Sequence, residues 1–352
     1  MSKVAEVLAK YSGLIERELR KLIPKQVDEE ELEKILGKPI YRYEVESINK
    51  TVLEPFWDLL ERGGKRWRPA LMLMIYKALG GDPEDIAPLS IIPEAIHNGT
   101  LVVDDVEDNS DYRRGKPCIH KLYGVDVAIN MGNTMYFLPL IWLTKSGIQE
   151  RKKLRILEEY VRTMTELSLG QAMDIAWHRG LVESIDEEQY LQMTLFKTGA
   201  LARFSAKIAT IMAETDEHVE KSIEDFSESM AIAFQIQDDV LNIVGEIEKY
   251  GKEIGGDIKE GKRTLMVIHA LNTLPREKAE RLQQILDMRT EDEKLIREAI
   301  NLIKESGAVE YAKEVSRRLA LKAREELEKA LPDSEAKEDL KTLIEFLISR
   351  EY

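Results

Sequence analysis

The apolar residues of this chain recur at three- and four-residue steps over most of its length, and this spacing strongly limits the possible folds. At the N-terminus one such stripe comprises Val4, Val7, Leu8, Tyr11, Leu14, Ile15, Leu19 and Leu22. The chain has only 20 glycines and 11 prolines in 352 residues, so its elements should be long and its turns few. From Thr51 to Asn272 the alternation typical of half-buried strands is missing. We therefore expect an all-α fold.

Several segments should form the long helices, namely 84–105, 123–145, 151–178, 187–214 and 217–244. Their apolar residues cover several faces, as in helices that are packed on more than one side. The first segment contains Pro88 and Pro93, so its helix should be kinked or begin late. Nearer the N-terminus, Pro24 should end one helix, and Asp28 with Glu31 should form a capping box for the next.

The same pattern suggests a division of the chain. Residues 1–50 should form an N-terminal helical extension, in which residues 37–50 serve as a linker. Residues 51–352 should form the main domain. The richly charged residues 275–352 should be its peripheral helical layer.

The charge and cysteine content exclude several classes of protein. A net charge of −14 should repel nucleic acid and acidic lipid, so an anionic substrate would need a local basic cluster. Cys118 is the single cysteine, which rules out an intramolecular disulfide and favours the cytoplasm. We find no signal-peptide pattern and no run of about 18 apolar residues, so we expect no transmembrane segment.

Acidic residues gather where a long apolar helix should end, in the stretch LVVDDVEDNSDYRRGKP. On a helix, Asp104 and Asp108 lie one turn apart on one face and could hold the same hard cation. Mg²⁺ is usually bound by one or two carboxylates together with substrate phosphates. The alternative, a solvated acidic helix end, is electrostatically unfavourable.

A second acidic pair, Asp238 and Asp239, lies in FQIQDDVLNIVG, again within a long apolar helix. If the two pairs faced one another across a helical bundle, they would form a polynuclear metal site. The helix ELSLGQAMDIAWHRG adds Gln171 and Asp174 to an apolar run. Buried acids are costly without partners, so these residues are hard to explain as surface.

Basic residues form the counterpart of these acids. The stretch RGGKRWRP places Arg62, Lys65, Arg66 and Arg68 around Gly63 and Gly64. Glycines let the backbone approach an anion, and arginine binds phosphate oxygens in a bidentate manner. Further candidates are Arg113, Arg114, Lys197, Thr198, Lys252 and Lys262. The alternatives are a basic surface loop at 62–69 and a mobile charged loop at 250–265.

The motifs GGKRWRP, DDVED…RRGKP, GQAMD, KTGAL, FQIQDD and GKEIGGDIKEGK have the order and spacing of the trans-prenyltransferases, the isoprenyl diphosphate synthases. The chain resembles this family over about residues 52–270. The residues DDVEDNS…RRGKP…YGV…AIN.GN.MYF are most similar to geranylgeranyl diphosphate synthases of the eukaryotic type. The resemblance implies an isoprenoid-synthase helical bundle around a central cavity, usually a homodimer, with residues 51–352 as the catalytic domain. It also implies condensation of isopentenyl diphosphate with dimethylallyl, geranyl or farnesyl diphosphate.

The resemblance also assigns roles to residues. It implies that three Mg²⁺ ions are held, with substrate bound, by Asp104, Asp105, Asp108, Asp238 and Asp239. It implies that the allylic diphosphate is contacted by Arg113, Lys197, Thr198, Gln235, Lys252 and Lys262, of which Lys197 also counts as catalytic. It implies that isopentenyl diphosphate is held by Lys65, Arg68, His97 and Arg114, with Gly64 shaping the loop. Asn242 departs from the family pattern, which usually has a third aspartate there, although the eukaryotic geranylgeranyl branch also has asparagine.

The length of the product should depend on the residues below Asp104 on its helix. Gly99 and Thr100 lie about one turn deeper and Ile96 about two. Both residues one turn down are small, so the growing chain should pass fifteen carbons. A floor could be formed by Tyr136, Phe137 or His120, whose alternative role is core packing. We expect twenty carbons, with twenty-five or thirty left open.

Three other functions are weighed against this one. A terpene cyclase of the same fold would not need GGKRWRP with Arg114 as a second diphosphate pocket. An inactive regulatory subunit would typically lose an aspartate motif, and this chain keeps both. A helical scaffold without chemistry leaves the acids within apolar helices unexplained.

Overall fold

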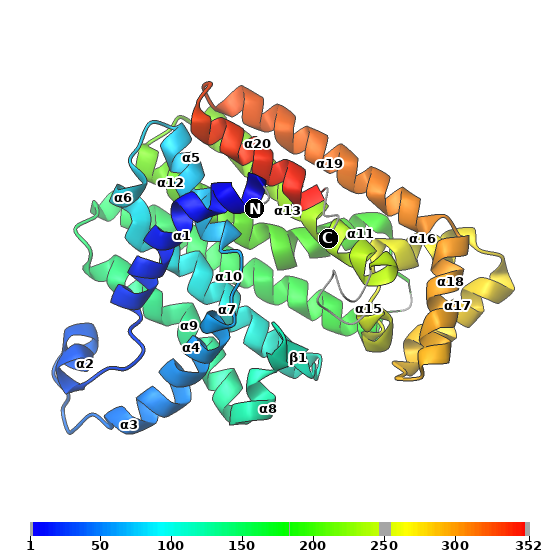
Figure 1. The fold of residues 1–352 in the computed structure, drawn as a ribbon, viewed down its shortest axis with the longest axis horizontal. Coiled ribbons are helices and arrows are strands. Elements are labelled where there is room, and N and C mark those ends of the chain that lie inside the picture. The colour runs from blue at the N-terminus through cyan, green and yellow to red at the C-terminus, as the bar shows by residue number, and fades with distance from the viewer. Residues whose placement is uncertain (1–2, 183, 246–254, 349–352) are drawn as a thin grey trace. The chain divides into compact units, whose positions relative to one another are not determined.

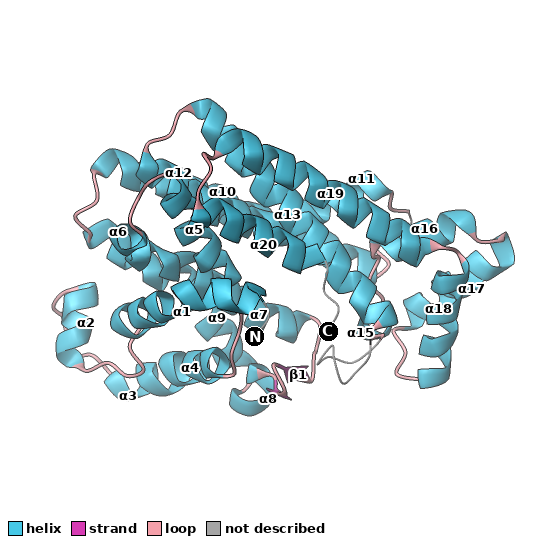
Figure 2. Ribbon diagram, turned by 45° about the horizontal axis from the view of Figure 1, so that its top comes forward, coloured by secondary structure: helices cyan, strands magenta, loops and turns pink. Residues whose placement is uncertain are grey.

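The computed structural model describes residues 3–182, 184–245 and 255–348, and these residues are almost entirely helical (Figure 2). The predicted all-α fold is confirmed. Contacts divide the chain into two compact units. Unit 1 comprises Met1–Leu157 and Ile208–Glu214, and unit 2 comprises Glu158–Lys207 and Thr215–Tyr352. Each unit is described by itself below.

Unit 1 begins with three helices and a π-helical turn before its central helices. The elements in chain order are α1 (Lys3–Leu22), α2 (Glu29–Leu36), α3 (Val45–Ile48), the π turn η1 (Asn49–Leu53), α4 (Glu54–Glu61), α5 (Trp67–Ala78), α6 (Pro83–Ile86), the 3-10 turn η2 (Ala87–Ser90), α7 (Ile91–Glu107), α8 (Ile119–Tyr123) and α9 (Val125–Lys145). A hairpin of two-residue strands, β1 (Tyr112–Arg113) and β2 (Lys116–Pro117), follows α7. The helix α10 (Glu150–His178) begins in this unit and continues into unit 2.

Helix α1 packs on α5, η2 and α7, so the N-terminal stripe lies in the core of unit 1. Most of the predicted stripe is buried, with Ile15 and Leu19 completely so. The predicted capping box is confirmed: Asp28 Oδ1 accepts from the Glu31 amide at 2.8 Å, and Glu31 Oε2 accepts from the Asp28 amide at 3.0 Å. The predicted linker over 37–50 is wrong at its end, because α3 already begins at Val45.

Helices α7 and α9 form the tightest pairing of unit 1, and two glycines make it possible. A Cβ on Gly99 would lie 2.7 Å from the carbonyl oxygen of Gly132, and a Cβ on Gly132 would lie 2.9 Å from that of Gly99. No side chain fits at such distances, so the two backbones touch directly. As predicted, the helix begins late, at Ile91, after the short elements α6 and η2; Pro88 lies in η2 and Pro93 in the first turn of α7.

Unit 2 is built around the helix α13 (Glu217–Val244), along which α19 (Ala308–Ala330) and α20 (Glu335–Ile348) run side by side (Figure 1). Its other elements are α11 (Glu187–Thr194), the π turn η3 (Leu195–Gly199), α15 (Gly256–Glu260), α16 (Leu265–Thr273), α17 (Arg276–Met288) and α18 (Glu293–Glu305). The helix α12 (Ala200–Ala213) begins in unit 2, and its residues from Ile208 onward belong to unit 1. The predicted helix over 187–214 is thus interrupted by a π turn at the KTG motif. The hydrophobic core of unit 2 includes Ile236, Leu282 and Ile285.

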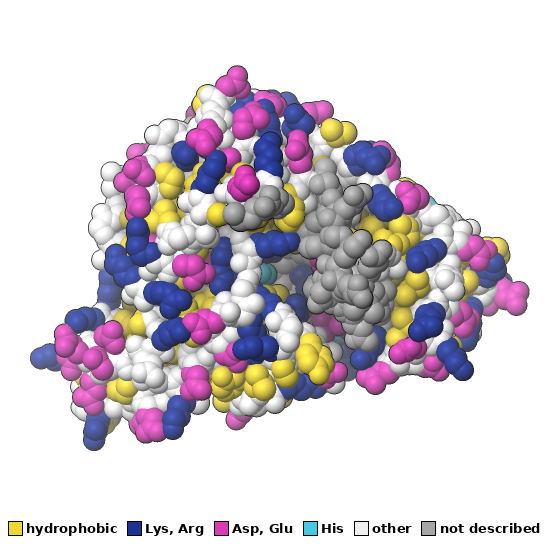
Figure 3. All heavy atoms as spheres, viewed as in Figure 1, with side chains coloured by type: hydrophobic (Ala, Val, Ile, Leu, Met, Phe, Trp, Pro, Cys, Tyr) yellow, Lys and Arg dark blue, Asp and Glu magenta, His cyan; other side chains and the backbone are white. Residues whose placement is uncertain are grey.

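The stretch Pro83–Glu107 is the one helical segment of the described chain that is long and apolar enough to cross a membrane by length and composition. Of its apolar window, 72% is buried inside the protein. One such helix is weak evidence for a membrane span, because a buried core helix passes the same test. On the surface, cationic and anionic side chains are intermixed over the face drawn in Figure 3.

Candidate functional site

The first aspartate motif occupies the end of α7. The Asp108 amide donates to the carbonyl of Asp104 at 2.8 Å and closes the last helical turn. Asp105 is 1% exposed, whereas Asp104 and Asp108 are partly exposed. The hairpin after the helix returns Arg113 to these acids: its Nε donates to Asp105 Oδ1 at 2.9 Å, and its Nη2 lies 3.7 Å from Asp104 Oδ2.

Arg113 thereby neutralises part of the acidic motif. Burial alone would lower the pKa of Arg113, but the carboxylates of Asp105 and Asp104 outweigh burial and raise it. Arg113 is therefore permanently charged here. An incoming diphosphate would have to share this cation with Asp105, so the predicted contact between Arg113 and the allylic diphosphate stays a prediction.

The oxygens of this motif fit a hard divalent cation. Oδ2 of Asp105 is buried and accepts no hydrogen bond within the described chain, which is costly for a carboxylate without a bound partner. Carboxylate oxygens are the ligands that Mg²⁺ prefers. Among the described residues no three His, Cys, Asp or Glu side chains are gathered closely enough to hold an ion by themselves. Substrate phosphates would have to complete the coordination.

Arg68 and Arg114 in unit 1 form no ion pair with the described residues and are therefore suited to bind an anion. Arg68 is 8% exposed, and its buried Nε has no hydrogen-bond partner in the described chain. Its Nη1 lies 3.3 Å from Nε2 of His97. Since an arginine can only donate, Nε2 accepts and the proton of the neutral imidazole is on Nδ1. Arg114 Nη1 donates to the carbonyl of Leu59 at 3.0 Å.

Electrostatics support this interpretation. Burial lowers the pKa of Arg68 to about 10, and burial together with neighbouring arginines lowers that of Arg114 to about 10. Burial and the arginines Arg68 and Arg114 hold the pKa of His97 well below 6.5. A site in which three basic groups are desolvated without enough negative charge would be stabilised by a bound anion. Lys65, also predicted here, is exposed.

Two arginines that the sequence suggested as diphosphate ligands have protein partners instead. Arg62 forms a bidentate ion pair with Asp58, at 3.1 and 3.0 Å, and donates to the carbonyl of Pro117 at 2.8 Å. Arg66 donates to Glu94 at 2.8 Å. Both side chains are almost completely buried. These two arginines therefore form ion pairs within the protein. The predicted isopentenyl diphosphate contacts of this motif, Lys65 and Arg68, stay predictions.

The second aspartate motif, on α13 of unit 2, is held by a chain of hydrogen bonds. Tyr190 donates to Asp239 Oδ2 at 2.7 Å, and Gln235 Nε2 donates to Asp239 Oδ1 at 2.8 Å. The hydroxyl of Thr198 donates to Gln235 Oε1 at 3.1 Å. Burial raises the pKa of Asp239 to about 6, with Asp238 adding to the rise, while the Gln235 and Tyr190 hydrogen bonds oppose it.

Other predicted residues of unit 2 also have partners. Lys197 Nζ donates to Asp174 Oδ2 at 2.6 Å, which explains how an acid is tolerated in an apolar helix. Lys262 Nζ lies 2.5 Å from Glu260 Oε2. Lys252 lies outside the described residues. Asn242 Oδ1 accepts from the Asp257 amide at 3.1 Å, so this oxygen already holds the backbone at the start of α15.

The predicted chain-length residues occupy different environments. Ile96 is completely buried. Thr100 is partly buried and its hydroxyl donates to the carbonyl of His97 at 2.9 Å. Gly99 faces the backbone of α9, so close packing gives an independent reason for a glycine there. Tyr136 lies beside Gly99, whereas Phe137 is 62% exposed and does not form a buried floor.

His120 is buried, and neither ring nitrogen has a hydrogen-bond partner in the described chain. Burial lowers its pKa. Tyr190 and Glu94, which hold parts of the site, were missed in the sequence. Both could have been identified from the sequence. Tyr190 precedes Lys197 by two helical turns, and Glu94 is an isolated acid in the apolar run IIPEAIHNG.

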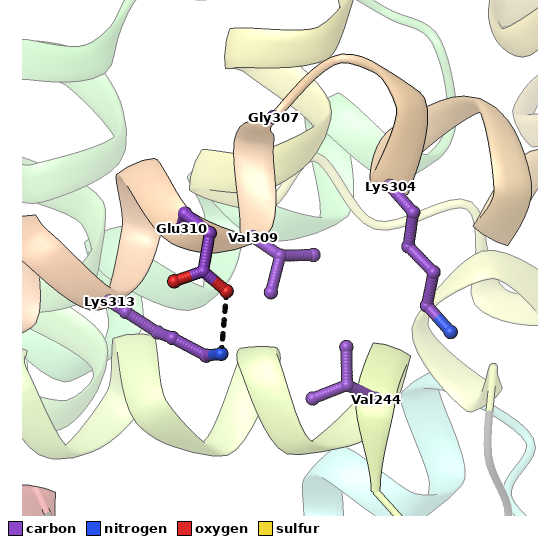
Figure 4. Close-up of a pocket in the computed structure, with 6 residues that line it drawn as sticks. All are labelled: Val244, Lys304, Gly307, Val309, Glu310 and Lys313. Carbon is purple, nitrogen blue, oxygen red and sulfur yellow. Dashed lines mark hydrogen bonds and ion pairs between the residues drawn. The ribbon is translucent and has the colours of Figure 1, made fainter.

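Figure 4 shows a separate cavity of about 270 Å³ in unit 2, near the start of α19. It is lined by Val244, Lys304, Gly307, Val309, Glu310 and Lys313. None of these is a predicted site residue. Lys313 and Glu310 pair with one another at 2.8 Å across its wall. This cavity has no part in the chemistry inferred from the motifs.

Comparison with known proteins gives consistent results. The model of the family described as polyprenyl synthetase matches residues 49–303. A short chain isoprenyl diphosphate synthase of Methanothermobacter thermautotrophicus is 34% identical over 352 residues, which is 100% of both chains. A geranylfarnesyl diphosphate synthase of Aeropyrum pernix is 33% identical over 83% of this chain and 92% of its own. The crystal structure of a geranylgeranyl pyrophosphate synthetase from Pyrococcus horikoshii is 33% identical, with a TM-score of 0.80 over 97% of this chain and 100% of that one.

Proposed function

Because this chain belongs to the polyprenyl synthetase family and is a trans-prenyltransferase, we propose that it condenses isopentenyl diphosphate with an allylic diphosphate to make geranylgeranyl diphosphate. The observation that carries the proposal is the cluster of Arg68, Arg114 and His97, three desolvated bases without sufficient counter-charge. An enzyme that joins two diphosphates needs such a pocket for the substrate that keeps its diphosphate. A cyclase, which binds one diphosphate, does not.

In this proposal the pocket of unit 1 positions isopentenyl diphosphate. Arg68 and Arg114 donate to phosphate oxygens, and binding compensates their desolvation. His97, with its proton on Nδ1, keeps the Arg68 guanidinium oriented through the 3.3 Å contact at Nε2. Gly64, whose φ is +142°, lets both Arg66 and Arg114 lie against the loop backbone.

The allylic diphosphate would be bound by carboxylates through metal and by bases directly. Asp104, Asp105 and Asp108 in unit 1, and Asp238 and Asp239 in unit 2, would each hold Mg²⁺. When bound, Mg²⁺ supplies positive charge that stabilises the departing diphosphate. Arg113 in unit 1, which is paired with Asp105, and Lys197 in unit 2, which is paired with Asp174, are the bases that we propose as diphosphate contacts.

The reaction itself then needs little covalent chemistry from the protein. The allylic C–O bond breaks and the diphosphate leaves with the electron pair. The double bond of isopentenyl diphosphate attacks the resulting allylic cation and forms the new C–C bond, and a proton is lost to the released diphosphate. The chain's contribution is to position both substrates and to exclude water from the cation.

Twenty carbons is the preferred product length. It is supported by the small residue Thr100 below the first motif and by the Pyrococcus relative, which is named for geranylgeranyl pyrophosphate. The Aeropyrum relative, named for the twenty-five-carbon geranylfarnesyl product, supports a second candidate. We further propose that the enzyme is a cytoplasmic homodimer.

The purified chain incubated with labelled isopentenyl diphosphate and each of the three allylic starters would test these proposals. We expect twenty-carbon product, loss of turnover in excess chelator and its recovery on adding Mg²⁺. A dominant twenty-five-carbon product would favour the second candidate. Full turnover in chelator would refute the metal assignment. Sedimentation of the same sample would give the oligomeric state.

A further inference from the structure

Arg66 lies in the middle of the GGKRWRP motif, but its guanidinium is directed into the protein. Nη1 donates to Glu94 Oε1 at 2.8 Å, Nη2 donates to the carbonyl of Leu60 at 2.8 Å, and Nε donates to Glu16 Oε1 at 3.1 Å. The residue is 7% exposed. One planar cation thus joins three elements: helix α7, the end of α4 and helix α1.

The backbone of Arg66 is also unusual. Its φ and ψ are 48° and 31°, the left-handed region that few residues other than glycine adopt. This conformation turns the chain at the start of α5, which begins at the next residue, Trp67. The direction in which Arg68 leaves the first turn of α5 depends on this turn. The three hydrogen bonds of the Arg66 side chain hold the backbone in its unfavourable conformation.

Arg66 is in contact with the rest of the diphosphate pocket as well. A Cβ on Gly64 would lie 2.8 Å from Arg66 Nη1 and 3.3 Å from Cζ and Nη2 of Arg114, so the two guanidinium groups flank the same glycine. On the other side, Glu94 precedes His97 by one turn of α7 and also accepts from Asn98 Nδ2 at 2.7 Å. The network therefore fixes both the loop and the helix that supply the pocket.

Glu16 extends the network to the N-terminus. It lies on α1, in the part of the chain that precedes residues 49–303, where the family model matches. Its side chain is 37% exposed, whereas that of Glu94 is 3% exposed. Two carboxylates against one guanidinium leave Arg66 fully compensated, in contrast to Arg68 and Arg114. Arg66 is thus suited to hold the pocket and not to bind the substrate.

We infer that Arg66 is a positioning residue for the isopentenyl diphosphate pocket, and that helix α1 helps to hold Arg66 in place through Glu16. The inference rests on the proposed function, because it assumes that Arg68, Arg114 and His97 bind this substrate. Removing hydrogen bonds of the Arg66 side chain should weaken isopentenyl diphosphate binding. Binding of the allylic substrate and the rate of the chemical step should stay nearly unchanged.

Two mild variants test this. Glu16→Gln keeps the shape and removes the charge. Arg66→Lys keeps the charge, but a single ammonium cannot reach three partners. For Glu16→Gln we expect the KM for isopentenyl diphosphate to rise about three- to tenfold, since a partly exposed ion pair contributes less than a buried one. For Arg66→Lys we expect a rise of about ten- to a hundredfold. The KM for the allylic substrate and kcat should change less than twofold.

The control is Glu6→Gln, the same charge change at an exposed position of α1. It should leave both constants unchanged. Thermal unfolding of each variant shows whether it is folded. Folded variants with an unaltered KM for isopentenyl diphosphate, or with both KM values raised equally, would overturn the inference. Wild-type chain that does not use isopentenyl diphosphate would instead refute the proposed function, so the two failures are distinguishable.

Discussion

The hydroxyl of Tyr190 donates a 2.7 Å hydrogen bond to Oδ2 of Asp239, and both residues are buried in unit 2. Tyr190 thereby fixes the orientation of a carboxylate that we assign to metal binding. Burial, with Asp239 nearby, raises the pKa of Tyr190 well above 10, so this phenol stays a donor at every relevant pH.

Replacing Tyr190 by Phe should therefore lower kcat without changing the fold. A hydrogen bond to a charged group contributes about 1.5–3 kcal/mol, so a loss of about tenfold or more is expected. Tyr311→Phe is the matched control, because it removes a 2.6 Å bond to another carboxylate, Glu187, in the same unit. Equal kinetic effects of both changes would show that Tyr190 does not act through Asp239.

The protonation of His97 should make folding stability depend on pH. Its pKa in the folded protein is well below 6.5, so below that pH the unfolded chain binds a proton that the folded chain does not. Stability is therefore lost as the pH falls below about 6.5, by at most about 1.4 kcal/mol per pH unit. Urea unfolding of wild type and His97→Gln at pH 7, 6 and 5 should show a smaller loss in the variant. Parallel curves would contradict the burial of a neutral His97.

The change Asn242→Asp should not alter the Mg²⁺ requirement. Asn242 Oδ1 already accepts the Asp257 amide at 3.1 Å, and an aspartate oxygen can do the same. We expect the Mg²⁺ concentration for half activity to stay within about twofold. Asn242→Ala, which loses the acceptor, should instead destabilise the start of α15. A marked fall in the Mg²⁺ requirement of Asn242→Asp would place this residue among the metal ligands.

Substitutions in the two basic sites should affect the kinetic constants of different substrates. Arg68→Ala should mainly raise the KM for isopentenyl diphosphate, and Lys197→Ala should mainly affect the allylic substrate, each by about ten- to a hundredfold. Arg276→Ala, which removes an exposed charge of α17, is the control. If Arg68→Ala and Lys197→Ala shifted both constants alike, the assignment of pockets would be wrong.

The length of the product should respond to Thr100→Phe. An aromatic ring one helical turn below Asp104 would fill space that a packed interior cannot supply elsewhere. We expect an active enzyme that releases mainly fifteen-carbon product, measured by chromatography of labelled products. A wild-type product distribution at full activity would show that the growing chain passes along another face.

The helices were predictable because burial imposes a period on the sequence, and the capping box at Asp28 is a local signal. The roles of the arginines were not. Arg66 and Arg68 are two residues apart and have the same side chain. Only Arg66 donates to Glu94, which lies 28 residues further along the chain, so the local sequence does not distinguish the two arginines. The ion pair between Asp58 and Arg62 could have been predicted from the local sequence, because the two residues are four positions apart. The π turn at the KTG motif has no comparable signal.

The contact between Gly99 and Gly132 limits how this enzyme can evolve. Each backbone carbonyl fills the space that a side chain at the other position would need, so neither glycine can be replaced alone. No residue is smaller than glycine, and a compensating second substitution therefore does not exist. We expect both positions to remain glycine in descendants of this sequence. Any lineage that acquires a different product would have to change at neighbours such as Thr100, which retain the freedom to vary.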